Sequence, residues 1–339
     1  MKSTVARVII AVLLLSCSIV SCNSNDSTPN VSDVKVDIKS HNFYQDFSKV
    51  DTNNIQASLN ELQKKYPEFL TFYLDDLVGL HTAGNYADTV QGLRFFLTYK
   101  DFRSLFDTVA KVYPDTKKID EELISLFKYI RHYDSSFTIP TDVYYYAAGL
   151  NLAVYTKLKT LGIGLDMFLG KDFKPYQQVG IPSFRLGRHT PANIPIAAAR
   201  AIYEEKYPII FDDKNLLALM IEQGKEYYFI KKVVPKASDA LLLGITEEQM
   251  KWCDENESLI YNYFIQQNLL YETNQQKVVR YVVEGPTAAG MPPESPGNTG
   301  SYAGLRIIEQ YAKNTGASLK EVMLEKDAQK ILTEAKYKP

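Results

Sequence analysis

Glu222 and Glu226 are the side chains in this sequence whose type and spacing point most directly to chemistry. In a helix they lie one turn apart on the same face. Gly224 lies between them and would let a second backbone approach closely, at a cost to helix propensity. One interpretation is half of a metal site, whose other half would be a helix bearing two histidines. The alternative is a solvated acidic helix face.

The other reactive side chains lack the spacing of catalytic motifs. Cys253 stands at an apolar position of a helical pattern, which favours a buried, inert thiol over a nucleophile. Neither Ser183 nor Ser295 lies in a Gly-x-Ser-x-Gly sequence. His189 precedes a predicted helix cap, so a surface or capping role is favoured over metal binding. No two histidines are spaced as a zinc-binding helix requires; they are His41, His81, His132 and His189.

The N-terminus has the order of segments found in a bacterial lipoprotein signal. Two basic residues precede an uninterrupted apolar run at 8–15, and two candidate lipidation sites follow, Cys17 and Cys22. Cys22 is favoured because its preceding residues fit the lipid-attachment box better and a polar stretch begins directly after it. A diacylated Cys22 would hold the protein on a membrane without spanning it. The alternatives are an ordinary secretory signal and an uncleaved anchor.

Composition places the rest of the chain among ordinary globular proteins. Hydrophobic residues make up 45% and charged residues 23%. The formal net charge of -2 argues against a nucleic-acid partner, which would attract a basic surface. Beyond the signal only Cys253 remains, so no internal disulfide can form. The 24 tyrosines could line a groove, although packing in the core is favoured.

Hydrophobic periodicity predicts helices first, then a small sheet, then helices again. The expected helices are 54–66, 67–77, 86–97, 100–113, 118–133, 191–206, 215–233, 246–270, 302–311, 318–324 and 327–335. The expected strands are 143–149 and 152–155, joined by a short turn around Asn151, and 162–170. Residues 284–300 are rich in glycine and proline and have the length of a lid or cleft rim. The fold class is α+β, predominantly helical with a small mixed or antiparallel sheet.

This order of elements resembles zinc peptidases of the gluzincin type. The resemblance rests on a sheet followed by a helix, on Glu-x-Gly-x-Glu-Tyr-Tyr at 222–228, on the glycine-rich loop, and on Gly-Ser-Tyr-Ala-Gly-Leu-Arg-Ile-Ile at 300–308. In such peptidases the helix after the sheet carries His-Glu-x-x-His, and a glutamate of the second helix is the third zinc ligand. The matching helix here, 192–203, has no histidine and no carboxylate before Glu204. The resemblance therefore implies a degenerate peptidase fold without catalysis, because a zinc site needs three protein ligands.

Other segments resemble the GldB family of gliding-motility lipoproteins of Bacteroidetes. They are Leu-Asp-Met-Phe-Leu-Gly at 165–170 with Tyr176, Thr-Pro-Ala-Asn-Ile at 190–194, and residues 249–257, 294–297 and 326–332. Together with the lipid box, this resemblance covers nearly the whole chain. It implies a cell-envelope lipoprotein needed for gliding, in organisms whose gliding is tied to a dedicated secretion machine. It implies no known molecular activity.

These observations predict a signal peptide at 1–21, a lipidated tether at 22–40 and a single domain at 41–339, helical over 41–135 and peptidase-like over 136–339. The protein is expected to be a non-catalytic component of the gliding machinery, without metal or cofactor. Its expected partners are the membrane, through Cys22, and another envelope protein. It is expected to face the periplasm, because few acidic residues follow Cys22.

The expected binding cleft contains Glu222, Glu226, Tyr302 and Arg306. Arg306 shares a helix face with Tyr302, and its guanidinium is expected to pair with the glutamates in place of a metal. One alternative is an envelope metal-dependent hydrolase with a rebuilt site that uses His189 and Glu222. Another is a rigid scaffold without a ligand cleft.

Overall fold

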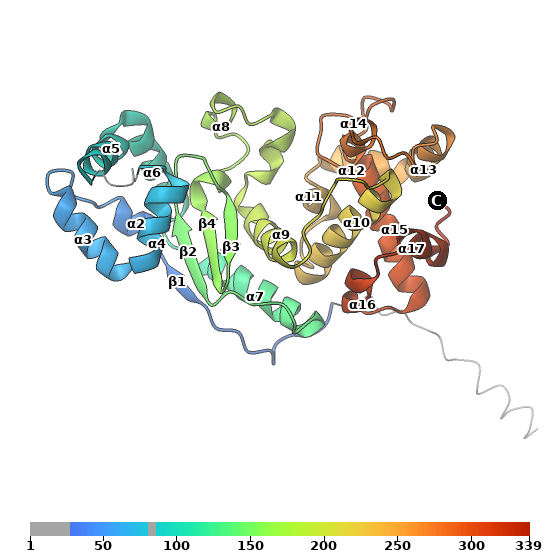
Figure 1. The fold of residues 1–339 in the computed structure, drawn as a ribbon, viewed down its shortest axis with the longest axis horizontal. Coiled ribbons are helices and arrows are strands. Elements are labelled where there is room, and N and C mark those ends of the chain that lie inside the picture. Colours follow the sequence, from blue (N-terminus) through green and yellow to red (C-terminus); the bar gives the residue numbers. More distant parts are fainter. Residues whose placement is uncertain (1–27, 81–85) are drawn as a thin grey trace, which may run out of the picture. The chain divides into compact units, whose positions relative to one another are not determined.

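The computed structural model describes residues 28–80 and 86–339. The expected signal peptide, Cys17 and Cys22 lie outside the described residues, as does His81. Residues 31–339 form one compact unit (Figure 1). No helix among the described residues is both long and apolar enough to cross a bilayer.

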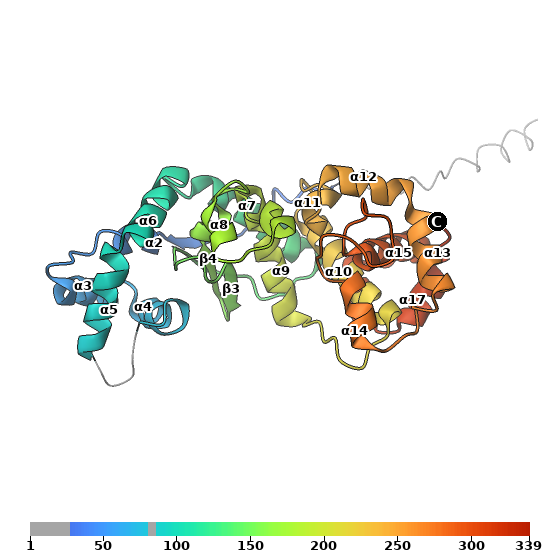
Figure 2. The ribbon, with the colours of Figure 1, turned by 90° about the horizontal axis from the view of Figure 1, so that it is seen from above.

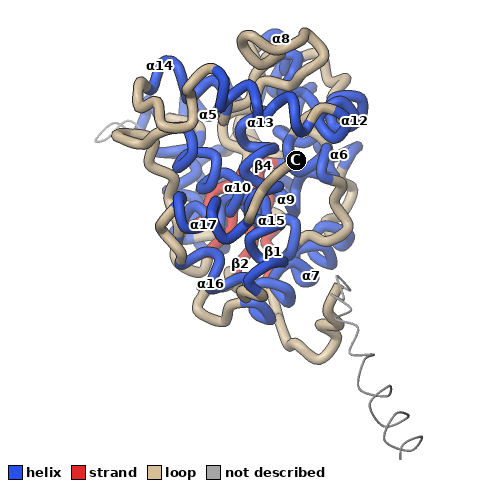
Figure 3. Tube along the Cα trace, turned by 90° about the vertical axis from the view of Figure 1, so that its right-hand side faces the viewer, coloured by secondary structure: helices blue, strands red, loops and turns tan. Residues whose placement is uncertain are grey.

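Four short strands form one mixed sheet. The strands are β1 (Lys39–His41), β2 (Asp142–Tyr146), β3 (Val154–Lys157) and β4 (Thr160–Gly164), in the order β1-β2-β4-β3. β1, β2 and β4 run parallel, and β3 is an antiparallel edge strand. Figure 3 shows how small this sheet is beside the helices, which confirms the α+β class. β1 begins within the segment expected to be tether.

The expected hairpin between 143–149 and 152–155 is wrong. β2 ends at Tyr146, and Gly149 and Leu150 follow with positive φ angles of 74° and 63°. The backbone N–H groups of Ala148 and Leu150 donate to the Asp166 carboxylate, at 3.0 and 2.8 Å. These bonds hold the segment as a loop, so β3 pairs with β4 instead.

The N-terminal helices pack beside the sheet (Figure 1), and an aromatic cluster lies among them. Phe43 lies between Phe47, Phe69 and Tyr73, with ring centroids 4.7–5.3 Å apart. Such offset and edge-to-face contacts add to the stabilisation that burial gives. The helical elements are α2 (Phe43–Phe47), α3 (Ile55–Lys65), α4 (Pro67–Phe72), the π-helical turn η1 (Tyr73–Leu77), α5 (Tyr86–Thr98), α6 (Lys100–Val112) and α7 (Lys117–Tyr133).

Short helical turns connect the sheet to the C-terminal helices. They are η2 (Leu165–Phe168), α8 (Pro175–Gln178), η3 (Ser183–Arg188) and η4 (Pro191–Asn193). The helices that follow are α9 (Ile194–Lys206), α10 (Leu216–Val233), α11 (Asp239–Leu243), α12 (Glu247–Glu255), α13 (Glu257–Gln266), α14 (Gln275–Val278), η5 (Val279–Tyr281), α15 (Thr299–Thr315), α16 (Leu319–Leu324) and α17 (Ala328–Ala335).

Helices α10 and α15 pack along each other (Figures 1 and 2), and they contact at two glycines. A Cβ atom at Gly224 would overlap the backbone carbonyl of Gly304, and one at Gly304 would overlap the carbonyl of Met220. The close approach predicted for Gly224 is therefore present. Because neither glycine carries a side chain, the two backbones can touch.

Two other expectations need correction. The single helix expected at 246–270 is two helices, because Asn256 leaves helical geometry at φ −122° and ψ 22° and its side chain bonds the Trp252 carbonyl. The expected lid at 284–300 is in its second half a packed segment: Ser295, Asn298 and Thr299 are at most 2% exposed.

Candidate functional site

Arg200 of α9 and Glu226 of α10 form the central ion pair of the candidate site. Arg200 Nε lies 2.5 Å from Glu226 Oε1, and the Glu226 side chain is 4% exposed. The Arg200 guanidinium also lies 5.6 Å from the centre of the Tyr227 ring. Burial by itself lowers the pKa of Arg200, but the neighbouring Glu226 charge outweighs it and raises the pKa. Glu226 therefore compensates the Arg200 charge in a largely buried setting.

Glu222 has a cation of its own. Its Oε1 pairs with Lys214, which immediately precedes Asn215, the N-cap of α10. Both glutamates that the sequence singled out are thus neutralised by residues outside α10. The interpretation as a solvated acidic face is wrong for Glu226, whose residue is 3% exposed.

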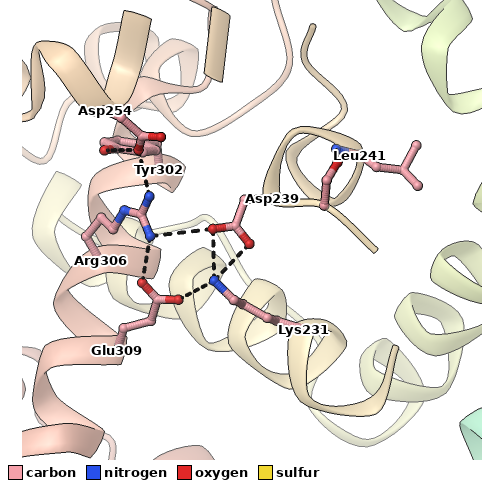
Figure 4. A network of polar contacts seen from close by, with 8 residues as sticks. Lys231, Asp239, Leu241, Asp254, Tyr302, Arg306 and Glu309 are labelled. Atoms are coloured by element: carbon pink, nitrogen blue, oxygen red, sulfur yellow. Dashed lines mark hydrogen bonds and ion pairs between the residues drawn. The ribbon is translucent and has the colours of Figure 1, made fainter. Parts of the chain in front are cut away.

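Arg306 of α15 belongs to a second polar network, drawn in Figure 4. Its Nη2 lies 2.7 Å from Asp254, and its Nη1 lies 2.9 Å from Glu309 and 3.5 Å from Asp239. Lys231 of α10 joins the same acids, at 2.8 Å from Asp239 and 2.6 Å from Glu309. This network ties α10, α11, α12 and α15 together through alternating charges.

Tyr302 is the remaining residue of the expected cleft. It is fully buried, and its hydroxyl donates to Asp254 at 3.0 Å (Figure 4). The Arg306 guanidinium lies 5.1 Å from the centre of its ring. Burial raises the pKa of Tyr302. Tyr302 therefore acts as a neutral donor inside the Arg306 network.

The expected pairing of Arg306 with Glu222 or Glu226 is wrong. All four expected cleft residues lie two positions from Gly224 or Gly304, where α10 and α15 touch. Two positions along a helix amount to a rotation of about 200°, so such side chains point away from the contact. The structure divides the four residues between two networks, one around Arg200 and one around Arg306.

A third group of charges links η3 to the segment before α15. Glu284 pairs with Arg188 and lies 3.2 Å from Arg185. Arg188 Nη2 also donates to the Leu243 carbonyl at 3.1 Å and lies 3.5 Å from the Tyr227 hydroxyl. Tyr227 therefore lies between this group and the Arg200 pair. Sequence reasoning missed Arg188, Arg200 and Glu284, because their spacing along the chain carries no signal.

The contacts of His189 and Cys253 are those of residues that pack in the fold. His189 Nδ1 lies 2.9 Å from the Met167 carbonyl, and its ring lies 4.7 Å from that of Tyr176. Burial lowers the pKa of His189. Its contacts do not include Glu222, the partner that the hydrolase alternative requires. Cys253 is fully buried, as predicted, and burial raises its pKa to about 12.

Asp166 is a buried carboxylate that sequence reasoning did not single out, although it lies in the 165–170 motif. It lies in η2, the turn that directly follows β4, and it is 0% exposed. Burial raises its pKa to about 6, against the opposing hydrogen bonds from the Leu150 and Ala148 amides. One carboxylate oxygen accepts these amides, and the other has no hydrogen-bond partner.

These residues do not fit a zinc ion. The α9 side chain that meets Glu226 is a guanidinium, which only donates hydrogen bonds and cannot ligate a cation. Across residues 28–80 and 86–339, no cluster of three or more histidine, cysteine or acidic side chains has the geometry of a metal site. What this arrangement can do is hold several helices in one fixed geometry through buried and half-buried charge pairs.

One comparison with known proteins gave a match. The model of a family described as gliding motility protein GldB matches residues 24–339, which include all three charge groups. Neither the curated proteins nor the solved structures gave a match to the chain.

Proposed function

This chain belongs to the GldB family of gliding motility proteins, and we propose that it serves gliding as a lipid-anchored, non-catalytic component of the cell envelope. On this proposal its folded part binds or helps to assemble another envelope protein of the gliding machinery. It faces the periplasm, on either the inner or the outer membrane.

The Arg200–Glu226 pair carries the non-catalytic part of the proposal. A gluzincin-type peptidase would hold its metal between the helix after the sheet and a glutamate of the next helix. At the corresponding place α9 offers Arg200, whose guanidinium lies 2.5 Å from Glu226. A largely buried cation at this point would repel a divalent metal, and it already engages Oε1 of the Glu226 carboxylate.

The charge networks support an assembly role. They connect α9, α10, α11, α12 and α15 through buried or half-buried pairs, and the glycine contact fixes α10 against α15. On this proposal, the charge pairs specify one arrangement of the helices more than they stabilise it. A body with fixed geometry suits a protein whose task is to present a surface to a partner.

The anchor rests on the N-terminal sequence. A basic start, an apolar run and Cys22 precede a polar segment, and the GldB family match begins two residues after Cys22. Two acyl chains on one cysteine give stable membrane attachment, whereas one chain gives only marginal binding.

The anchor is tested by Cys22→Ser in the native organism, followed by fractionation of the envelope. We expect the wild-type protein in the membrane fraction and the variant in the soluble fraction or retained as unprocessed precursor. Cys17→Ser is the matched control and should fractionate like the wild type. If Cys22→Ser leaves processing and membrane attachment unchanged, the lipidation proposal is wrong.

The non-catalytic role is tested with Glu222→Gln and His189→Gln, the two residues that the hydrolase alternative needs. In a strain without the gene, both variants should restore gliding as well as the wild type when they accumulate equally. Zinc should be substoichiometric in wild-type protein purified without chelators. Stoichiometric zinc that disappears in Glu222→Gln, together with lost gliding, would support the hydrolase instead.

The binding role is tested by crosslinking in intact cells and purification of the full-length protein from membranes. An envelope protein should be recovered with the wild-type protein, in the same amount in each repeated purification. The same protein should be absent when the membrane fraction of the gene-deletion strain is processed alike. Recovery of no specific envelope protein from gliding cells would contradict the assembly role.

A further inference from the structure

Leu158, at the turn between β3 and β4, combines two unusual properties. Its side chain is the most exposed of the large apolar side chains among the described residues, at 77%. It also has a φ of 56°, in the left-handed region that glycine and asparagine adopt more easily. Of the other exposed large apolar residues that the structure describes, none has a positive φ. An exposed leucine held in a disfavoured conformation suggests that its side chain has a use.

Lysines surround this leucine. Lys157 and Lys159 flank it, and both are exposed. Thr141 connects the turn to β1, because its amide donates to the Lys159 carbonyl at 2.8 Å while its own carbonyl accepts from the Lys39 amide at 2.7 Å. The exposed Lys39 therefore lies at the same end of the sheet.

Acidic side chains only partly offset this charge. Asp142, which pairs with Lys39 in the sheet register, is engaged with His41 at 2.9 Å. Asp37 is exposed in the segment before β1. Three lysines against these two acids leave a net positive charge among these residues, around an apolar side chain.

The chain also enters the fold at this end. Residues 31–38 lead into β1, and Figure 1 shows them at the same end of the sheet as the β3–β4 turn. The nine residue steps between Cys22 and Val31 span at most about 30 Å when fully extended. A lipid on Cys22 would therefore hold Val31 within about 30 Å of the bilayer surface, and residues 32–38 lead from there to this end of the sheet.

We propose that the β3–β4 turn is a second membrane contact, in which Leu158 enters the boundary between headgroups and acyl chains while Lys157, Lys159 and Lys39 contact anionic headgroups. This inference rests on the lipid anchor of the proposed function. One leucine and three lysines bind a bilayer weakly on their own, but the tether raises their local concentration at the surface. The contact orients the folded body, so that the opposite ends of the parallel strands face away from the membrane.

The test uses the full-length lipidated protein in vesicles of phosphatidylethanolamine with about one third phosphatidylglycerol. Leu158→Cys is labelled with a polarity-sensitive fluorophore, because Cys253 is buried and Cys22 carries the lipid. Lipids that bear a quencher near the headgroup should quench this label at least about twofold more than a label on Ile210→Cys. Ile210 is the matched control, since it is apolar and 59% exposed. Changing Lys157 and Lys159 to glutamine should reduce the quenching at position 158.

The outcomes separate the two proposals. If the protein does not float with the vesicles, the lipid anchor is wrong and the membrane contact is wrong with it. If the protein floats but the labels at 158 and 210 are quenched equally, the anchor stands and the contact is wrong. Protection of the label in native envelope membranes, but not in pure lipid vesicles, would show a protein partner and also overturn the proposal. Lys159→Cys serves as a second label site if Leu158→Cys does not fold.

Discussion

Glu226 of α10 lies 2.5 Å from Arg200 of α9, with only 4% of the glutamate side chain exposed. This pair replaces the partnership of Glu226 with Arg306 that the sequence suggested. It also links α9, the helix after the sheet, to α10.

Removing one member of this pair should be far more damaging than removing both. Glu226→Ala leaves the Arg200 guanidinium without its counter-charge, and should lower the free energy of unfolding by about 3 kcal/mol or more. Changing both residues to leucine should cost much less than the sum of the costs of Arg200→Leu and Glu226→Leu. Chemical denaturation of the wild type, these two single variants and the double variant measures the free energies of unfolding. Glu61→Ala is the control, because its pair with Lys64 is 73% exposed on both sides and should contribute less than about 1 kcal/mol. Equal effects at 61 and 226 would contradict the prediction.

The contact between α10 and α15 should not tolerate a methyl group. Gly304→Ala would place a Cβ against the Met220 carbonyl, so the helices must separate, at a cost of about 1–3 kcal/mol or more. Gly187→Ala is the control, because a Cβ there meets nothing within 4 Å. The measurement is the change in the free energy of unfolding. A Gly304→Ala protein as stable as Gly187→Ala would show that the two helices are not in backbone contact.

Asp166 should make stability fall as pH rises from about 4 to about 6. Burial raises its pKa from 3.8 to about 6, so in this window the folded state binds more protons than the unfolded state. The contribution of Asp166 to the free energy of unfolding is fully present below the pKa that this carboxyl has in the unfolded state. It is lost as pH rises through the pKa in the folded state, by up to about 3 kcal/mol. Asp166→Asn cannot ionise, so its stability relative to the wild type should improve by a similar amount between pH 4 and 7. Urea unfolding at each pH measures the difference.

Asp134 provides a control of opposite sign. Burial would raise its pKa, but hydrogen bonds from Ser136 and Lys206 lower it to about 2. The stabilisation that the Asp134 carboxylate gives is present above its pKa in the unfolded state and is lost as pH falls towards 2. Asp134→Asn should therefore be less stable than the wild type at pH 7, by up to about 2 kcal/mol. If the pH profiles of the two asparagine variants shift in the same direction, the assignment of the Asp166 effect is wrong.

Leu158→Gly should stabilise the protein while removing the proposed membrane contact. Glycine adopts the φ of 56° without the steric penalty of leucine, although it loses more backbone entropy on folding, so the gain should be up to about 1 kcal/mol. Thermal unfolding measures the gain. Ile210→Gly is the control and should show no gain, because Ile210 has no positive φ. A destabilised Leu158→Gly protein would show that the leucine is retained for the stability of the turn.

The sequence by itself determined the features that depend only on residues close together along the chain. The apolar spacing of α7 predicted its buried face, and Ile119, Leu123, Phe127 and Ile130 are at most 6% exposed. Gly224 predicted a close backbone approach, and the position of Cys253 predicted a buried thiol. These predictions needed only the periodicity of one helix, because a residue's place on its own helix follows from the backbone geometry.

The tertiary structure alone decided which elements meet. The sequence offered Arg306 as the partner of Glu226, and the fold uses Arg200; it offered a hairpin of β2 with β3, and the fold pairs β3 with β4. Ion pairs between helices depend on how each helix is rotated about its axis, and that rotation is set where α10 and α15 touch at Gly224 and Gly304. Composition and spacing along the chain do not give that rotation, so they could not predict the partners of side chains that lie two positions, about 200°, from those glycines.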